Sequence, residues 1–351
     1  MKSYAIIAMA LLVLSVMPMV MATSVGTGVG VSITTEQFTP RIWMCDNRVF
    51  EDDFIQNTEK AQKRANNYAF EGESIKWTVL VMDKNKIEEI TDVVGTIGPS
   101  QGVGNDVEVE CTRVTSTVKG TPAGNCNARI LEENLTTFKS ETMAYYDCKL
   151  TVETPASMHG EYFITIEAMD STGLSATMDE NEYWFLNPTI ALSVEGDLEF
   201  EDVRPGTQAY SQTLLLGNDA EAGSGVVLDM FMSGTDFYDP SSSGARCSDN
   251  TNKLALEEFK YFATNGQYST AKTAITGKDD ENYAPIPLGT AINQAREIIG
   301  NQTFANPMVK ITPGNTLTPG AEMALTFKLT MPEPCVGDFS EGQIYFWGEA
   351  I

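Results

Sequence analysis

The sequence predicts an all-β protein with two antiparallel β-sandwich domains. Apolar residues recur at every second position in many short runs, and turn residues separate these runs at intervals of about 8 to 12 residues. A clear example is Ile190 to Val194, which is followed by the turn Glu195-Gly196-Asp197. Because successive side chains of a strand point to opposite faces, each run indicates a strand with one buried face.

Residues 1–22 predict a cleaved secretory signal peptide. Lys2 supplies the charged start, residues 5–14 are apolar, and Val20-Met21-Ala22 is a small-residue cleavage site. The alternative is a signal anchor that stays in the membrane. No later apolar stretch approaches the roughly 20 residues that a membrane span needs. We therefore expect a secreted, extracellular or cell-surface protein without a transmembrane anchor after signal removal.

Residues 23–39 predict a strand-like N-terminal arm. Val29, Val31 and Ile33 alternate with Gly28, Gly30 and Ser32. Two interpretations remain open for this pattern. The arm is either the first strand of its own domain or a free strand that completes the unpaired sheet edge of another subunit.

Residues 40–187 predict the first sandwich domain. Asn187-Pro188 marks its end, since proline keeps the preceding residue out of the helical region. The expected strands include residues 75–81, 87–97, 107–111, 146–152, 162–168 and 184–185.

Residues 188–351 predict the second sandwich domain. Its strongest pattern is the alternation from Met323 to Met331, which lies between Gly320 and Pro332. Two segments, Leu254–Phe262 and Thr290–Ile299, predict short helices; Thr290 is the expected N-cap of the second.

Six cysteines predict three disulfides in an exported chain. Two of them, Cys247 and Cys335, follow Asn187 and should pair with each other. The four earlier cysteines leave three pairings open, and a Cys111–Cys126 bond would close the loop between them. The earlier cysteines are Cys45, Cys111, Cys126 and Cys148.

The formal net charge of −25 argues against a nucleic-acid partner, because phosphate binding needs clustered Lys and Arg. The acidity indicates either a solvated surface or charges that recruit divalent cations. Carboxylate-bearing turns at Asp83-Lys84-Asn85, at Asp170 and at residues 179–182 make Ca²⁺ the one cofactor worth considering. We expect no other cofactor or metal.

The sequence predicts no catalytic residue. A Ser-His-acid hydrolase needs a histidine base, and the only histidine, His159, falls in an expected surface loop. Paired carboxylates for glycoside hydrolysis are not singled out among the 48 acids. Asn134 and Asn301 begin Asn-x-Thr sequons and are candidate glycosylation sites.

Residues 162–185 resemble the closing strands of bacterial-type immunoglobulin-like domains, which pair across an Asp-x-x-Gly turn. Tyr146, two residues before Cys148, is similar to the Tyr-x-Cys of immunoglobulin domains. This resemblance implies an Ig-like first sandwich.

The second domain resembles the TasA/camelysin-type secreted proteins. The shared features are two Pro-Gly turns, an Asn after the second strand, and a closing Gly-x-Phe-x-x-Gly-x-Ile-x-Phe pattern. In this chain they are Pro205-Gly206, Asn218, Pro319-Gly320, Gly337, Phe339, Gly342, Ile344 and Phe346. The resemblance implies a jelly-roll-like sandwich and polymerisation by N-terminal strand donation. The whole chain also resembles secreted two-domain proteins of archaea.

These observations predict a structural subunit of an extracellular filament or surface layer that self-associates, and the N-terminal arm is the candidate segment for that assembly. The alternative is a monomeric secreted adhesion or binding module for a glycan or a protein. A secreted hydrolase ranks third.

Overall fold

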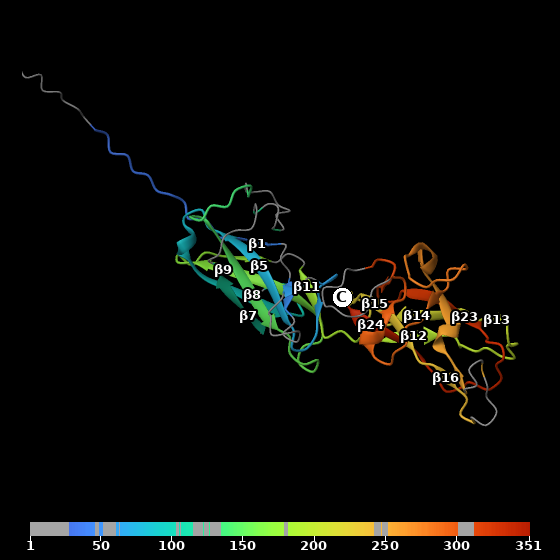
Figure 1. Ribbon diagram of the computed structural model, residues 1–351. Helices are drawn as coiled ribbons and strands as arrows, with labels where there is room; N and C mark the ends of the chain where they lie inside the picture. The colour runs from blue at the N-terminus through green and yellow to red at the C-terminus, as the bar shows by residue number, and fades with distance from the viewer. Residues whose placement is uncertain are drawn as a thin grey trace, which may run out of the picture. The chain divides into compact units, whose positions relative to one another are not determined.

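The computed structural model describes residues 28–45, 49–51, 61–62, 64–102, 105, 107–114, 122, 126, 135–178, 182–241, 247, 252–300 and 312–351 (Figure 1). The signal peptide predicted at residues 1–22 and both candidate glycosylation sites, Asn134 and Asn301, lie outside these residues. Across the described ranges, no helix has the length and hydropathy needed to cross a membrane.

The chain divides into two compact units, Met1–Gln37 and Phe38–Ile351. The described residues 28–37 of the first unit form no strand. Val29, Val31 and Ile33 are 89%, 76% and 82% exposed. The apolar side chains of the arm therefore face solvent, and the described part of the arm pairs with no strand.

Within the second unit the fold is all-β, as predicted. Strands β1 to β11 belong to one hydrogen-bonded sheet, in which β1 and β10 branch from β5 and β9, and the sheet folds into two packed layers that we call the first sandwich. Its strands are β1 (Arg41–Met44), β2 (Val49–Glu51), β3 (Ala61–Gln62), β4 (Tyr68–Ala69), β5 (Ser74–Met82), β6 (Ile90–Gly98), β7 (Val107–Arg113), β8 (Met143–Thr151), β9 (Gly160–Asp170), β10 (Ser175–Met178) and β11 (Tyr183–Leu186), with a 3-10 turn η1 (Ile87–Glu89).

Strand β7 joins the two layers because it changes partner halfway. Val107–Val109 pair with β6, whereas residues 110–113 pair with β8. Apolar side chains from both layers meet between them around the fully buried Trp77. Apart from the parallel pair β11–β4, the described strand pairs of this sandwich are antiparallel.

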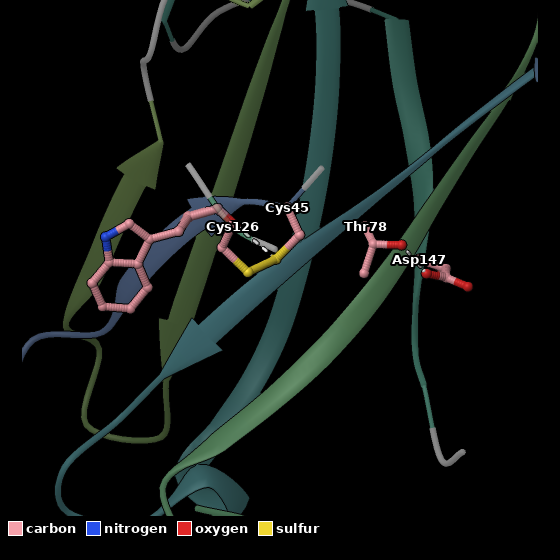
Figure 2. The surroundings of a disulfide bond; sticks show 5 residues. Cys45, Thr78, Cys126 and Asp147 are labelled. Atoms are coloured by element: carbon pink, nitrogen blue, oxygen red, sulfur yellow. Dashed lines mark hydrogen bonds between the residues drawn. A yellow bond between two sulfur atoms is a disulfide. The ribbon is translucent and has the colours of Figure 1, made fainter. Parts of the chain in front are cut away.

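Two disulfides cross-link the first sandwich. Cys111 bonds to Cys148, directly opposite it in the β7–β8 ladder. The loop-closing Cys111–Cys126 bond considered from the sequence is therefore wrong, since Cys126 bonds to Cys45 at the end of β1. Figure 2 shows the Cys45–Cys126 bond together with Thr78, whose hydroxyl donates a 2.6 Å hydrogen bond to the Asp147 carboxylate.

The strands that follow Leu186 pair with one another in a separate set of sheets. A seven-stranded sheet with the core order β12-β14-β23-β18-β19 packs on a four-stranded sheet around β15. We call these two sheets, together with the two-stranded sheet β16–β17, the second sandwich. Its strands are β12 (Leu192–Glu195), β13 (Gln208–Tyr210), β14 (Leu214–Asn218), β15 (Leu228–Gly234), β16 (Phe237–Tyr238), β17 (Lys253–Leu254), β18 (Phe259–Asn265), β19 (Tyr268–Ser269), β20 (Ala284–Pro285), β21 (Arg296–Glu297), β22 (Thr316–Leu317), β23 (Glu322–Thr330) and β24 (Ile344–Ala350), with 3-10 turns η2 (Leu256–Glu258), η3 (Thr270–Lys272) and η4 (Ile292–Gln294).

Both short helices predicted in this region are wrong. Most of Leu254–Phe262 belongs to β17 and β18, because Phe259 and Tyr261 alternate into the core and pair with β23. Within Thr290–Ile299 the side chain of Gln294 accepts hydrogen bonds from two preceding backbone N–H groups. This turn limits the helical geometry to η4, and β21 then pairs with β15.

The segment before Pro188 is held by side-chain hydrogen bonds. Asn187 is buried, has φ 48°, and donates to the carbonyls of Glu153 and Met158 at 2.8 and 2.6 Å. Tyr68 of β4 is buried among side chains of the second core, and its hydroxyl donates to the carbonyl of Ile351. The two sandwiches therefore share buried contacts.

Candidate functional site

A cavity of about 460 Å³ opens in the second sandwich where β16, β17, β18 and β23 meet two loops. We call it the second-sandwich cavity. Most of the residues that line it are apolar by type, but polar atoms contribute at least as much of the exposed lining surface as apolar ones. The lining residues are Leu198, Phe200, Asp202, Val203, Pro205, Phe237, Leu254, Phe259, Leu329, Met331, Cys335, Val336, Gly337, Asp338 and Phe339. Its volume falls in the range usual for ligand sites.

The centre of the lining is aromatic. Phe259 is buried at the start of β18, and its ring lies 4.6 Å from that of Phe237 and 5.9 Å from that of Phe200 between centroids. Strand alternation directs Phe259 and Leu329 toward the core, where they are Cα partners in the β18–β23 ladder. Their side chains supply a rigid apolar floor.

A buried carboxylate positions one wall. Asp239 accepts hydrogen bonds from the backbone N–H and the hydroxyl of Ser241 at 2.8 and 2.6 Å. Its second oxygen accepts from the backbone N–H of Asp338 at 3.1 Å. The disulfide Cys247–Cys335, the pairing expected from the sequence, attaches the same wall to the loop that contains Cys247. These contacts fix residues 335–339 beside the apolar floor.

The charged side chains of the lining are two acids. Among the described lining residues these are Asp202 and Asp338, and both are exposed. A glycoside hydrolase pairs a carboxylate with a second acid whose pKa is raised by an apolar pocket. Two exposed acids beside phenylalanine rings instead suit recognition of an apolar group with a positive charge nearby.

The other residues singled out in the sequence lie away from this lining. His159 Nε2 lies 3.0 Å from a carboxylate oxygen of Glu221 and is half-exposed. Asp83 and Asp170 each accept hydrogen bonds from the backbone of their own turns. Among the described residues, no group of three or more His, Cys, Asp or Glu side chains is arranged to hold a metal ion.

Sequence reasoning did not identify the cavity, although it did single out part of the lining. Pro205, Gly337 and Phe339 appear among the residues that resemble the TasA/camelysin pattern. The sequence singled out these residues because they form a Pro-Gly turn and a Gly-x-Phe pattern next to a strand. Nothing in the sequence pattern showed that residues 198–205 and 335–339 line one cavity.

No protein-family model matches the chain, and no curated protein sequence is significantly similar to it. Among solved structures, the chain is similar to the C-terminal domain of the AgI/II polypeptide BspA from Streptococcus agalactiae, with 11% identity, a TM-score of 0.29, and 89% of this chain and 96% of that chain covered. It is also similar to the sialic acid binding region of a Streptococcus sanguinis adhesin, with 13% identity, a TM-score of 0.21, and 89% and 78% covered. At these TM-scores the likeness carries no argument about function.

Proposed function

We propose that this protein is an extracellular binding module that recognises a partner through the second-sandwich cavity and performs no catalysis. The observation that carries the proposal is a preformed cavity of about 460 Å³ whose floor is aromatic and whose charged groups are exposed carboxylates. The three disulfides support an extracellular location, since such bonds persist in oxidising compartments.

The charges favour one class of ligand. Asp202 and Asp338 line the cavity, and the whole chain carries a formal charge of −25. An anionic ligand would be repelled, whereas a basic one would be attracted before contact. We therefore propose a protein segment that inserts an apolar side chain into the cavity and carries Lys or Arg beside it.

The test uses Val336, an exposed lining residue, and a matched control outside the cavity. Val336 and Leu288 are both 65% exposed, so neither substitution disturbs a core. The probes are Nile red, a neutral apolar dye, and synthetic peptides with one Phe or Leu flanked by Lys or by Glu. We expect Val336→Arg to weaken dye and Lys-peptide binding about tenfold, the effect of losing roughly 1.4 kcal/mol of contact energy.

Leu288→Arg should bind as the unaltered protein does. Equal binding by both variants would overturn the proposal, as would a preference for Glu-flanked peptides. Binding of neutral sugars on a glycan array, with no peptide binding, would replace the protein partner with a glycan.

A second candidate function is a subunit of an extracellular filament or surface layer. Its supporting observation is the arm, in which Val29, Val31 and Ile33 expose their side chains with strand periodicity. Such a segment is suited to completing a sheet edge of another copy, as the TasA/camelysin resemblance predicts. Negative-stain microscopy should then show polymers that disappear when residues 23–35 are deleted. Single particles in the intact protein would remove this candidate.

A further inference from the structure

The four-stranded sheet of the second sandwich has a strand with an open edge. Strand β24 pairs with β15 along its whole length (Figure 1). Its other edge has no partner strand in the part of the chain that the structure describes. An edge of this kind presents unpaired N–H and C=O groups and can therefore bind another extended strand.

Two hydrogen bonds at the ends of the β15–β24 ladder identify the open groups. The backbone N–H of Ile351 donates to the carbonyl of Val227, and that of Thr235 donates to the carbonyl of Gln343. In an antiparallel ladder, pairs that bond to each other alternate with pairs whose groups point away. The odd-numbered residues of β24 therefore bond to β15. The even-numbered residues direct their N–H and C=O groups to the open edge, and these are Ile344, Phe346, Gly348 and Ala350.

The same alternation is satisfied on the other side of β15. Its even-numbered residues face away from β24 and have partners there. The backbone N–H of Met230 donates to the carbonyl of Asn315, and that of Gly234 donates to the carbonyl of Pro287. Strand β15 thus has partners on both sides, whereas β24 has a partner on one side within the described residues.

The length and composition of β24 distinguish its edge from the others. Proteins protect open edges by keeping the strand short or by placing Lys, Pro or a bulge on it. Among the described strands at the ends of the other sheets, β3, β4 and β19 have two residues and β12 has four. Strand β24 has seven residues, contains neither Lys nor Pro, and keeps a continuous register against β15.

The two faces of β24 offer different contacts to an added strand. Ile344, Phe346 and Ala350 pack against the second core on the inner face. On the outer face the rings of Tyr345 and Trp347 lie 6.0 Å apart between centroids. All seven residues are only partly buried, so a strand placed beside β24 would contact both rows of side chains.

We propose that the open edge of β24 binds β24 of a second copy of this chain, antiparallel, across a two-fold axis at Trp347. Each copy presents the same edge to the other, so the interface is self-complementary and closes as a dimer. The even-numbered residues of the two strands exchange backbone hydrogen bonds. The two four-stranded sheets then form one continuous sheet.

The inner-face side chains are matched in size in this register. Phe346 lies opposite Gly348 of the second copy, and Ile344 lies opposite Ala350 of the second copy. Each large side chain therefore faces a small one. A shift of two residues would place either Phe346 opposite Phe346 or Gly348 opposite Gly348, and it would lose this match.

The outer-face side chains are also compatible. The two Trp347 indoles face each other across the axis, and Tyr345 faces Glu349 of the second copy. Aromatic cross-strand pairs stabilise a sheet, whereas like charges directly opposite each other destabilise it. Glu349 is the one charged residue of β24 and meets no charge in this register. A shift that centres the axis on Glu349 would place two carboxylates together.

The first measurement is sedimentation velocity of the purified full-length protein over a wide range of concentrations. We expect a species of twice the chain mass that dissociates to a monomer on dilution. A monomer mass at every concentration would overturn the proposal. None of the β24 residues lines the second-sandwich cavity, so binding at the cavity and dimerisation can be lost separately.

Charge variants at the axis test the contact between the two strands. Trp347→Lys and Trp347→Glu each place like charges opposite each other, and each should weaken dimerisation by about tenfold or more. A mixture of the two should form a heterodimer, which also shows that both variants fold. Tyr183→Lys, at a 42% exposed aromatic position of β11, is the control and should leave the dimer unchanged. Dimers of either Trp347 variant alone, or a mixture that stays monomeric, would contradict the axis.

Single cysteines test the register without changing its charge. The Cα atoms of the two residues 347 would lie about 4.5 Å apart in a non-hydrogen-bonded pair, within the range of a disulfide. Oxidised Trp347→Cys should therefore run as a covalent dimer on a non-reducing gel. Tyr345→Cys alone should stay monomeric there, because the two residues 345 would be about 13 Å apart. Tyr345→Cys mixed with Glu349→Cys should cross-link. A covalent dimer from Tyr345→Cys alone, or none from Trp347→Cys, would overturn the register.

Deletion of residues 23–35 separates this dimer from assembly through the arm. The β24 dimer should persist in the deletion variant with an unchanged dissociation constant. Its loss would identify the arm as the strand that occupies the open edge and would overturn the proposal.

Discussion

The two sandwiches of this chain connect their layers in different ways. In the first, strand β7 passes from one layer to the other, and Cys111–Cys148 fastens it to β8. In the second, a buried amide links the sheets. Asn218 of β14 donates to the carbonyls of Val226 and Leu317 at 3.0 and 2.8 Å, and Leu317 belongs to the opposite sheet.

Both sandwiches bury hydrogen-bonded polar side chains, and the difference lies in what these side chains join. Asp83 and Asp170 of the first sandwich hold their own turns. Asn218 of the second sandwich hydrogen-bonds from one sheet to the other. The first core surrounds Trp77, the largest fully buried side chain. The second buries Asn218, Asn315 and Asp229 completely or almost so. The comparison predicts that each sandwich has its own most sensitive kind of substitution.

The largest loss of unfolding free energy should come from Trp77→Ala in the first sandwich. Removing a fully buried indole costs about 3–5 kcal/mol, from lost apolar burial and the cavity left behind. The measurement is denaturant unfolding together with calorimetry. Tyr183→Ala, at a 42% exposed position of the same sandwich, is the control and should cost well under half as much. Similar losses in the two variants would refute a core organised around Trp77.

The second-largest loss of unfolding free energy should come from Asn218→Leu in the second sandwich. The substitution preserves side-chain volume approximately but leaves two carbonyls and the backbone N–H of Ala220 without their partner. Each unsatisfied buried group costs about 1–3 kcal/mol, so we expect a total loss of about 2–4 kcal/mol after partial relaxation.

Asn265→Leu is its control in the same unfolding measurement. Asn265 also donates to two carbonyls, those of Gly314 and Thr316, but it is only partly buried. Water can replace its hydrogen bonds, and the loss should be about 1 kcal/mol or less. If the two variants lose equal stability, buried amides do not distinguish the second sandwich.

The sequence was sufficient for the strands and insufficient for what lies between them. Val79 and Val81 of β5, like Leu325 and Phe327 of β23, alternate with residues on the other face, and each run forms the strand it predicts. A period of two is a local property, so one run reveals one strand. The same pattern assigned Lys328 to the polar face, but its burial depends on a turn 45 or more residues away.

The two wrong helix predictions and the failure to predict the cavity have the same physical cause. Leu256–Glu258 does begin a helical turn, but pairing of Phe259 with Leu329 converts the remainder into strand. Similarly, Phe200 and Phe339 approach one cavity because distant loops meet over β18 and β23. Local propensity is overridden by long-range pairing in both cases, and a single sequence does not specify which segments meet.

The smallest expected effect is a dependence of stability on pH, located in the second sandwich. Glu349 of β24 is the Cα partner of Asp229 of β15. Burial, with a contribution from the Asp229 charge, raises the pKa of Glu349 to about 7, and burial raises that of Asp229 to about 6. In the unfolded chain both pKa values are near 4. Between about pH 4 and pH 7 the folded protein therefore binds more protons than the unfolded one.

Stability must then fall as pH rises through this window, because the state that binds more protons is favoured at low pH. We expect the melting temperature to decrease by a few degrees from pH 5 to pH 8 and this slope to flatten in Glu349→Gln. The lowered pKa values of Asp170, Asp279 and Glu281 act in the opposite direction only below the window. Glu322→Gln, at an exposed position of β23, should keep the slope of the unaltered protein. A melting temperature that rises with pH would show that the carboxyl pair is stabilised in its charged form by contacts stronger than the burial that opposes it. A slope unchanged in Glu349→Gln would show that the pH dependence does not come from Glu349.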